Sequence, residues 1–127
     1  MTIKFHNPDT LHPSTVLSYA AQVGNILFTS GLTPRDPGTG EIVEGDISVQ
    51  ARVVFGNLDR VLEAAGASIT NVAKVTVYLT DIKDAGGMNN IYKNYFGEFR
   101  PARTTVEISS LTPGMLIEIE AIVALPD

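Results

Sequence analysis

The sequence predicts an α+β fold in which two helices pack on one face of a mixed β-sheet. Strand-like and helix-like segments follow one another in the order β, β, α, β, α, β, β, and each helical segment has an apolar stripe that can pack on a sheet. The chain has 127 residues, 44% of them hydrophobic and 18% charged, which is typical of a compact globular protein. We therefore expect one domain over residues 1–127.

The N-terminal part of the chain predicts a β-hairpin. Residues 19–23 and 26–30 are rich in β-forming side chains, and Gly24-Asn25 between them suits a two-residue turn. A further strand is expected at residues 3–5. Residues 31–45 contain several prolines and glycines, so we expect a surface loop there.

Two helices are predicted from apolar spacing. Asp46 can cap the first, and Gly66 stands where it should end. Its apolar positions step by three or four residues: Ile47, Ala51, Val54, Leu58, Val61, Leu62 and Ala65. The second helix is expected over residues 81–99, and Pro101 should mark its end. Its stripe comprises Met88, Ile91, Tyr92, Tyr95 and Phe96.

Three further strands follow from strict alternation of side chains. In residues 72–80 one face is apolar and consists of Ala73, Val75, Val77 and Leu79. Residues 103–108 form the next predicted strand. In residues 117–123, Glu118 and Glu120 share the face opposite the isoleucines.

The sheet face away from the helices is expected to be mixed. It would carry Lys74, Thr76, Tyr78, Arg103, Thr105, Glu118 and Glu120, together with Leu116 and Ile122. Such a face is too apolar for an ordinary solvated surface and too polar for a core. A subunit interface that encloses polar pockets fits it best, so we expect an oligomer.

Composition excludes several classes of function. The net charge is −5 and no cluster of Lys or Arg is present, so nucleic-acid binding is not expected. Cysteine is absent, and His6 and His12 lack metal-ligand spacing, so no metal site is expected. No segment resembles a signal peptide or a membrane span, which favours a cytoplasmic protein without a membrane partner.

Arg103 is a candidate binding residue. It follows Pro101-Ala102 at the start of a strand, and a guanidinium binds a planar carboxylate through two parallel hydrogen bonds. The structural alternative is an ion pair with a glutamate of the same chain: Glu107, Glu118 or Glu120.

Glu118 and Glu120 are candidate general acids or bases. A partly desolvated carboxyl beside another acid has a raised pKa, as such a role requires. The alternative is that both lie on the exposed face of an edge strand. Asn89 and Asn90 lie near the start of the second predicted helix and are polar candidates for a site. The structural alternative is that both are ordinary solvated helix positions.

Several motifs, in one order along the chain, resemble the reactive intermediate deaminase family, also called Rid or YjgF. They extend over nearly the whole chain and comprise Gly24-Asn25-x-x-Phe28-Thr29-Ser30-Gly31, Asn57-Leu58-x-x-Val61-Leu62-x-Ala64-Ala65-Gly66-Ala67, Val75-x-Val77-Tyr78-Leu79-x-Asp81, Met88-Asn89-x-x-Tyr92-x-x-Tyr95-Phe96, Pro101-Ala102-Arg103 and Ile117-Glu118-Ile119-Glu120-Ala121. The resemblance implies a fold like that of chorismate mutase from bacilli and a barrel-like homotrimer. It also implies clefts between subunits that bind small carboxylates.

The same resemblance implies a reaction and a set of residues. The reaction is cofactor-independent hydrolysis of 2-enamino or 2-imino acids, such as 2-aminoacrylate, to 2-keto acids and ammonia. Arg103 would hold the substrate carboxylate, Glu118 would direct the attacking water, and Glu120 would support it. Ser30, Gly31 and Asn89 would line the cleft.

Three positions depart from the family pattern. Leu17 stands where deaminating relatives carry tyrosine, Thr105 replaces a frequent cysteine, and Leu32 replaces a glutamine. A less polar pocket favours a larger or more apolar imino acid, or an enamine like aminomuconate. Two other functions stay open: a trimer that binds 2-keto acids without turnover, and the ribonuclease or translation inhibitor named in this family, against which the acidic charge argues.

Overall fold

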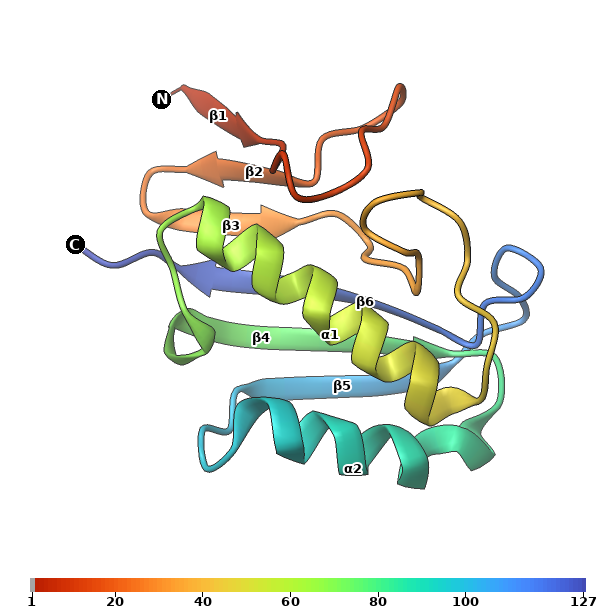
Figure 1. The fold of residues 1–127 in the computed structure, drawn as a ribbon. Coiled ribbons are helices and arrows are strands. Elements are labelled where there is room, and N and C mark those ends of the chain that lie inside the picture. Colours follow the sequence, from red (N-terminus) through yellow and green to blue (C-terminus); the bar gives the residue numbers. More distant parts are fainter. Residues whose placement is uncertain (1) are drawn as a thin grey trace.

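A computed structural model of the chain describes residues 2–127 and shows a six-stranded sheet with two helices on one face (Figure 1). The strand order is β1-β2-β3-β6-β4-β5. Only β4 and β5 pair in parallel among the described strands, so the sheet is mixed, as predicted. The strands are β1 (Ile3–His6), β2 (Ala20–Val23), β3 (Ile26–Thr29), β4 (Val72–Leu79), β5 (Ala102–Glu107) and β6 (Ile117–Ala124).

The first helix, α1 (Ile47–Ala64), begins as its sequence predicts. Asp46 is the N-cap, and its Oδ1 accepts a hydrogen bond from the backbone N–H of Val49 at 3.1 Å. The short 3-10 helix η1 (Ile69–Asn71) then leads into β4. All the predicted apolar positions of α1 up to Leu62 are buried against the sheet, whereas Ala65 is only partly buried.

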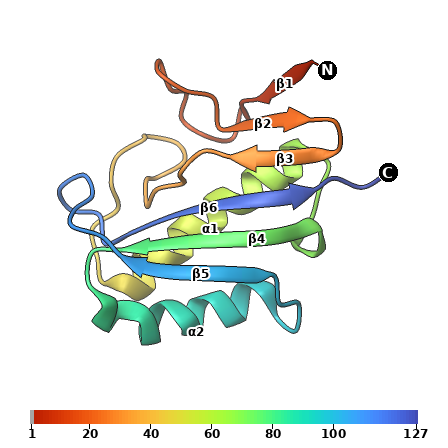
Figure 2. The same cartoon turned by 180° about the vertical axis from the view of Figure 1, so that it is seen from behind.

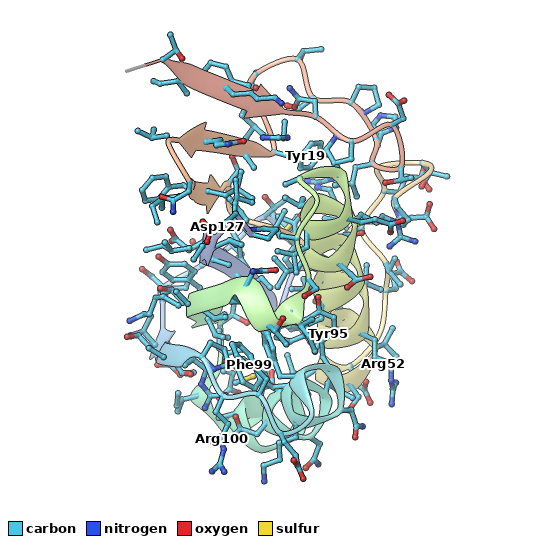
Figure 3. The ribbon with its side chains drawn as sticks, turned by 90° about the vertical axis from the view of Figure 1, so that its left-hand side faces the viewer. Tyr19, Arg52, Tyr95, Phe99, Arg100 and Asp127 are labelled. Carbon is cyan, nitrogen blue, oxygen red and sulfur yellow. The ribbon has the colours of Figure 1, made fainter. Side chains whose placement is uncertain are left out.

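The second helix is shorter than predicted. The 3-10 helix η2 (Ile82–Asp84) comes first, and α2 runs from Ala85 to Phe96. Gly97, with φ of 63°, ends α2 four residues before Pro101, because glycine adopts this left-handed conformation without steric cost. Tyr95 lies between the two helices, where its ring stacks on that of Phe55 at 5.3 Å between centroids (Figure 3).

The core lies between the helices and the centre of the sheet. Side chains of β4 and β6 that face the helices are at most 3% exposed: Val72, Val75, Val77, Leu79, Ile117, Ile119, Ala121 and Val123. The prediction that Ala73 faces the core is wrong. A register shift between Val72 and Lys74 turns Val72 inward and leaves Ala73 exposed.

The opposite face of the sheet has no helix over it (Figure 2). Register pairs place Phe28 opposite Ile122, Glu120 opposite Thr76, and Glu118 opposite Tyr78 on this face. Several of its apolar side chains are more than one third exposed, among them Phe5, Phe28, Val106 and Ile122. The predicted mixture of polar and apolar side chains is therefore present on this face.

The predicted place of Arg103 and Thr105 on this open face is wrong. In the parallel pair of β4 and β5, Arg103 is opposite Val75 and Thr105 is opposite Val77. Because cross-strand partners point to the same side of a sheet, both residues face the helices. Arg103 and Glu118 consequently lie on opposite faces of the sheet.

Candidate active site

Arg103 is held against α2 at the edge of the sheet. Its Nη1 donates a hydrogen bond to Oδ1 of Asn89 at 2.7 Å, and its Cζ lies 4.6 Å from the centroid of the Tyr92 ring. The structural alternative of an ion pair with a glutamate does not fit these contacts. Glu118 and Glu120 lie on the other face, and Oε1 of Glu107 accepts the backbone N–H of Ile82 instead. The guanidinium keeps donors free for a ligand.

A cavity of about 490 Å³ opens beside this arginine. Arg103 and Asn89 both line it, together with the cations Lys93 and Arg100 and the acid Glu98. Cations outnumber acids in this lining, so the cavity suits an anion. Asn89 is half-buried and orients Arg103, whereas Asn90 is exposed, as expected of an ordinary helix position.

Glu118 faces a different and larger cavity, of about 660 Å³. The residue is half-buried, and burial raises the pKa of its carboxyl, with a further increase from the negative charge of Glu120. Among residues 2–127, no hydrogen bond occupies this carboxylate. A carboxyl in this state can exchange a proton with a water molecule in the cavity.

Glu120 differs from Glu118 in its contacts. It is exposed, and its Oε1 accepts a hydrogen bond from the hydroxyl of Tyr78. That hydrogen bond is the main reason for the raised pKa of Tyr78. Of the two glutamates, Glu118 is thus the one with a free carboxylate.

Gly31 lies directly against this free carboxylate. A β-carbon built on Gly31 would stand 2.3 Å from Oε2 of Glu118, much closer than atoms in proteins approach. Two backbone hydrogen bonds between Leu32 and Ile119, of 2.6 and 3.0 Å, hold the chain in this place. Any larger residue here would force the end of the Glu118 side chain to move.

The other predicted cleft residues have different surroundings. Leu17 lines the cavity of Glu118 and is 49% exposed. Ser30 lines neither cavity. Its Oγ donates a hydrogen bond to the backbone carbonyl of Ser18 at 2.6 Å, which attaches the segment before β2 to the end of β3. Thr105 also lines neither, and its Oγ1 is buried without a hydrogen-bond partner among the described residues.

The cavity of Glu118 also contains polar residues that were not predicted from the sequence, among them His12, Arg35, Asp36 and Asn57. Asn57 is buried, and its Nδ2 donates to the carbonyls of Thr33 at 3.0 Å and Arg35 at 2.9 Å. No local spacing indicates this grouping, because it depends on contacts between distant parts of the chain.

Two further features concern residues 2–127. No group of three or more His, Cys, Asp or Glu side chains is placed to hold a metal ion. None of the described helices is long and apolar enough to cross a membrane.

Comparisons with known proteins agree with this architecture. Residues 8–125 match a family model described as Endoribonuclease L-PSP. A RutC family protein of Pyrococcus abyssi is 53% identical over 105 residues, which make up 83% of each chain. The 2-iminobutanoate/2-iminopropanoate deaminase of Rattus norvegicus is 43% identical over 105 residues, or 83% of this chain and 77% of the rat protein.

A solved structure extends the comparison to the fold. YyfA from Yersinia pestis, a protein of unknown function from the conserved Rid protein family, matches with a TM-score of 0.93 at 37% identity, covering 98% of this chain and 100% of that one. The mixed sheet with two helices thus defines an α+β protein of the YjgF and L-PSP architecture. The chain belongs to the Rid/YjgF family, which confirms the resemblance seen in its motifs.

Proposed function

We propose that this protein hydrolyses 2-imino and 2-enamino acids to 2-keto acids and ammonia without a cofactor. The observation that carries the proposal is Glu118, a half-buried carboxyl with a raised pKa and a free carboxylate that faces a cavity. Relatives 40–43% identical to the chain are named as imine deaminases, which supports an enzyme of this kind.

The proposed reaction needs one anchor and one proton carrier. Arg103 binds the substrate carboxylate through its free donors. Glu118 accepts a proton from water as the water oxygen bonds to the imine carbon, and the electron pair of the C=N bond moves to nitrogen, which takes that proton from Glu118. The proton of the new hydroxyl then passes to the nitrogen, again through Glu118, as the C–N bond breaks, so that ammonia leaves and the keto group forms. An enamine first takes a proton on carbon and so becomes the imine.

We further propose that two protomers complete each site. Arg103 and Glu118 of one chain lie on opposite faces of the sheet and line separate cavities. A second copy can bring its own Glu118 cavity to the Arg103 edge of the first. A closed ring of three copies, as the family resemblance implies, would form three equal sites through such head-to-tail contacts.

The test is turnover of imino acids generated in place. An amino-acid oxidase forms 2-iminopropanoate from alanine, and semicarbazide traps the imine that escapes hydrolysis. We expect the wild type to speed keto-acid and ammonia release and to suppress trapping, and Arg103→Ala to abolish both effects. Equal rates with and without protein, over a panel of imino acids, would refute an enzyme. Calorimetric binding of a keto acid in that case would favour a non-catalytic binding protein.

The name of the matching family model also raises ribonuclease activity. The net charge of −5 argues against it, because an acidic protein repels a phosphate backbone. RNA cleavage that persists through purification and is lost in Arg103→Ala would support that activity instead.

A further inference from the structure

The cavity beside Glu118 has a second region, which we call its basic end because it contains the guanidinium of Arg35. Arg35 and His12 line the same cavity of about 660 Å³ as Glu118, and Asp36 lines it as well. Cavities of roughly 300–1,000 Å³ hold drug-sized ligands, so this one is larger than a three-carbon imino acid requires. The additional space is therefore open to a longer part of a ligand, to water or to side chains of the second protomer.

The guanidinium of Arg35 uses only some of its hydrogen-bond donors within the protein. Its Nη1 donates to the carbonyl of Gly40 at 2.9 Å, and the side chain is part-buried. A guanidinium has five N–H donors in one plane, so this single bond leaves most of them free. Such a group binds a carboxylate strongly when it is held in place.

The neighbouring acid, Asp36, also lines the cavity, but its contacts are with other groups. Its Oδ1 accepts hydrogen bonds from the backbone N–H groups of Gly38 at 2.9 Å and Thr39 at 3.0 Å. These two amides are the main cause of the lowered pKa of Asp36, and the cation that contributes to it is Arg60. The free donors of Arg35 are therefore not taken up by hydrogen bonds to Asp36.

His12 lies against the same turn as Arg35. Its Nδ1 is 3.2 Å from the carbonyl oxygen of Gly38, and a β-carbon on Gly40 would stand 2.6 Å from its Cδ2. The carbonyl of Gly40 is also the acceptor for Arg35. The imidazole and the guanidinium are thus both held by the turn at residues 38–40, and both line the cavity.

The wall between this basic end and Glu118 is held in place. The backbone of Leu32 is hydrogen-bonded to that of Ile119, the residue after Glu118. The Nδ2 of Asn57 donates hydrogen bonds to the backbone carbonyls of Thr33 and Arg35. Arg35 also pairs with Ile42 across a short bridge. The position of the guanidinium relative to Glu118 is therefore preset and does not depend on a mobile loop.

We propose that Arg35, with His12 beside it, binds a second carboxylate at the far end of the substrate, so that the preferred substrates are 2-imino or 2-enamino dicarboxylic acids. This inference rests on the proposed function, because it takes the Glu118 region as the place of the reacting carbon. The bonds that form and break stay those of imine hydrolysis, and only the side chain of the substrate changes.

The test compares imino acids that differ only at the far end. 2-Iminoglutarate and 2-iminopentanoate have the same chain length, as do 2-iminoadipate and 2-iminohexanoate, and oxidases can form each from its amino acid. In at least one pair we expect kcat/KM to be about tenfold or more higher for the dicarboxylate. Arg35→Gln should remove this preference by lowering kcat/KM far more for the dicarboxylate than for the monocarboxylate. Arg35→Lys, which keeps the charge but not the paired donors of a guanidinium, should keep part of the preference for the dicarboxylate.

Arg52→Gln is the matched control, because it removes the same charge from an exposed residue that lines neither cavity. It should leave the preference intact. If the wild type hydrolyses both members of each pair equally and Arg35→Gln changes neither, the second carboxylate site is wrong while the deaminase proposal stands.

The second carboxylate site can still be tested if the proposed reaction itself is wrong. If no imino acid is turned over, the proposed reaction is wrong, and calorimetry with 2-ketoglutarate and 2-ketopentanoate then tests the basic site alone. Tighter binding of the dicarboxylate that is lost in Arg35→Gln would support the site. Equal binding, or none, would overturn it.

Discussion

The backbone of Gly31 leaves no space beside the carboxylate of Glu118, since a β-carbon at that position would stand 2.3 Å from Oε2. The two residues are held together by the bridge between Leu32 and Ile119, which follow them in the chain. The proposed acid/base is therefore positioned by a backbone contact, which a single methyl group would disturb.

Gly31→Ala should lower kcat by roughly 10- to 100-fold, the effect expected when a catalytic group is displaced by about 1 Å. The protein should still fold, because Gly31 is exposed and its backbone needs no left-handed conformation. Imino-acid turnover and circular dichroism measure the two properties. Gly86→Ala is the control, since a β-carbon there meets nothing within 4 Å, and it should leave kcat unchanged.

Arg103→Lys should weaken the enzyme despite keeping the positive charge. Lysine cannot reproduce the paired donors of a guanidinium or its planar stacking on Tyr92. We expect kcat/KM to fall by roughly 10- to 100-fold, which corresponds to one lost charged hydrogen bond of about 1.5–3 kcal/mol. Equal kcat/KM in Arg103→Lys and the wild type would show that simple charge attraction is sufficient.

Mixtures of two inactive variants test the composite site. Arg103→Ala and Glu118→Gln chains, unfolded together and refolded at equal amounts, should regain activity. If each site takes Arg103 from one chain and Glu118 from its neighbour, random mixing leaves about one quarter of the sites intact. Each variant refolded alone stays inactive and serves as the control. A mixture with no activity would mean that both residues of a site belong to one chain.

The pH dependence of stability should report the burial of Glu118. Its folded pKa is raised, so the native state holds the proton more tightly than the unfolded chain does. The wild type therefore loses stability as the pH rises from the ordinary carboxyl value, about 4.5, through the folded pKa. Glu118→Gln should be more stable than the wild type above that range and similar below it.

Urea unfolding at several pH values measures this difference. Glu63→Gln, at an exposed position of α1, is the reference for the loss of one negative charge. A gain in stability for Glu118→Gln that is the same at acidic and neutral pH would contradict the burial argument.

The sequence predicted the features that depend on near neighbours. The turn at Gly24-Asn25, the cap at Asp46 and the alternation around Glu118 each involve residues close in the chain, and the structure contains all three. The end of α2 was missed because glycine and proline both stop helices, and Gly97 comes first.

Features that depend on pairing between distant segments were predicted less well. Alternation correctly grouped Arg103, Thr105 and Glu107, but the face they share is decided by the parallel register with β4. The register shift between Val72 and Lys74 likewise places the side chain of Ala73 on the face opposite to the predicted one. The Glu118 cavity joins segments around His12, Arg35 and Asn57, and no spacing along the chain indicates that they meet.

The segment before β2 is attached through its backbone carbonyl groups, which do not depend on the side chains at those positions. Ser30 holds it through the carbonyl of Ser18, and the hydroxyl of Tyr19 donates to the carbonyl of His12, so both bonds end on backbone atoms. Leu17 and His12 line the cavity. Mutations at these two positions can therefore alter ligand selectivity while the attachment persists, which gives evolution a route to new specificities on an unchanged scaffold.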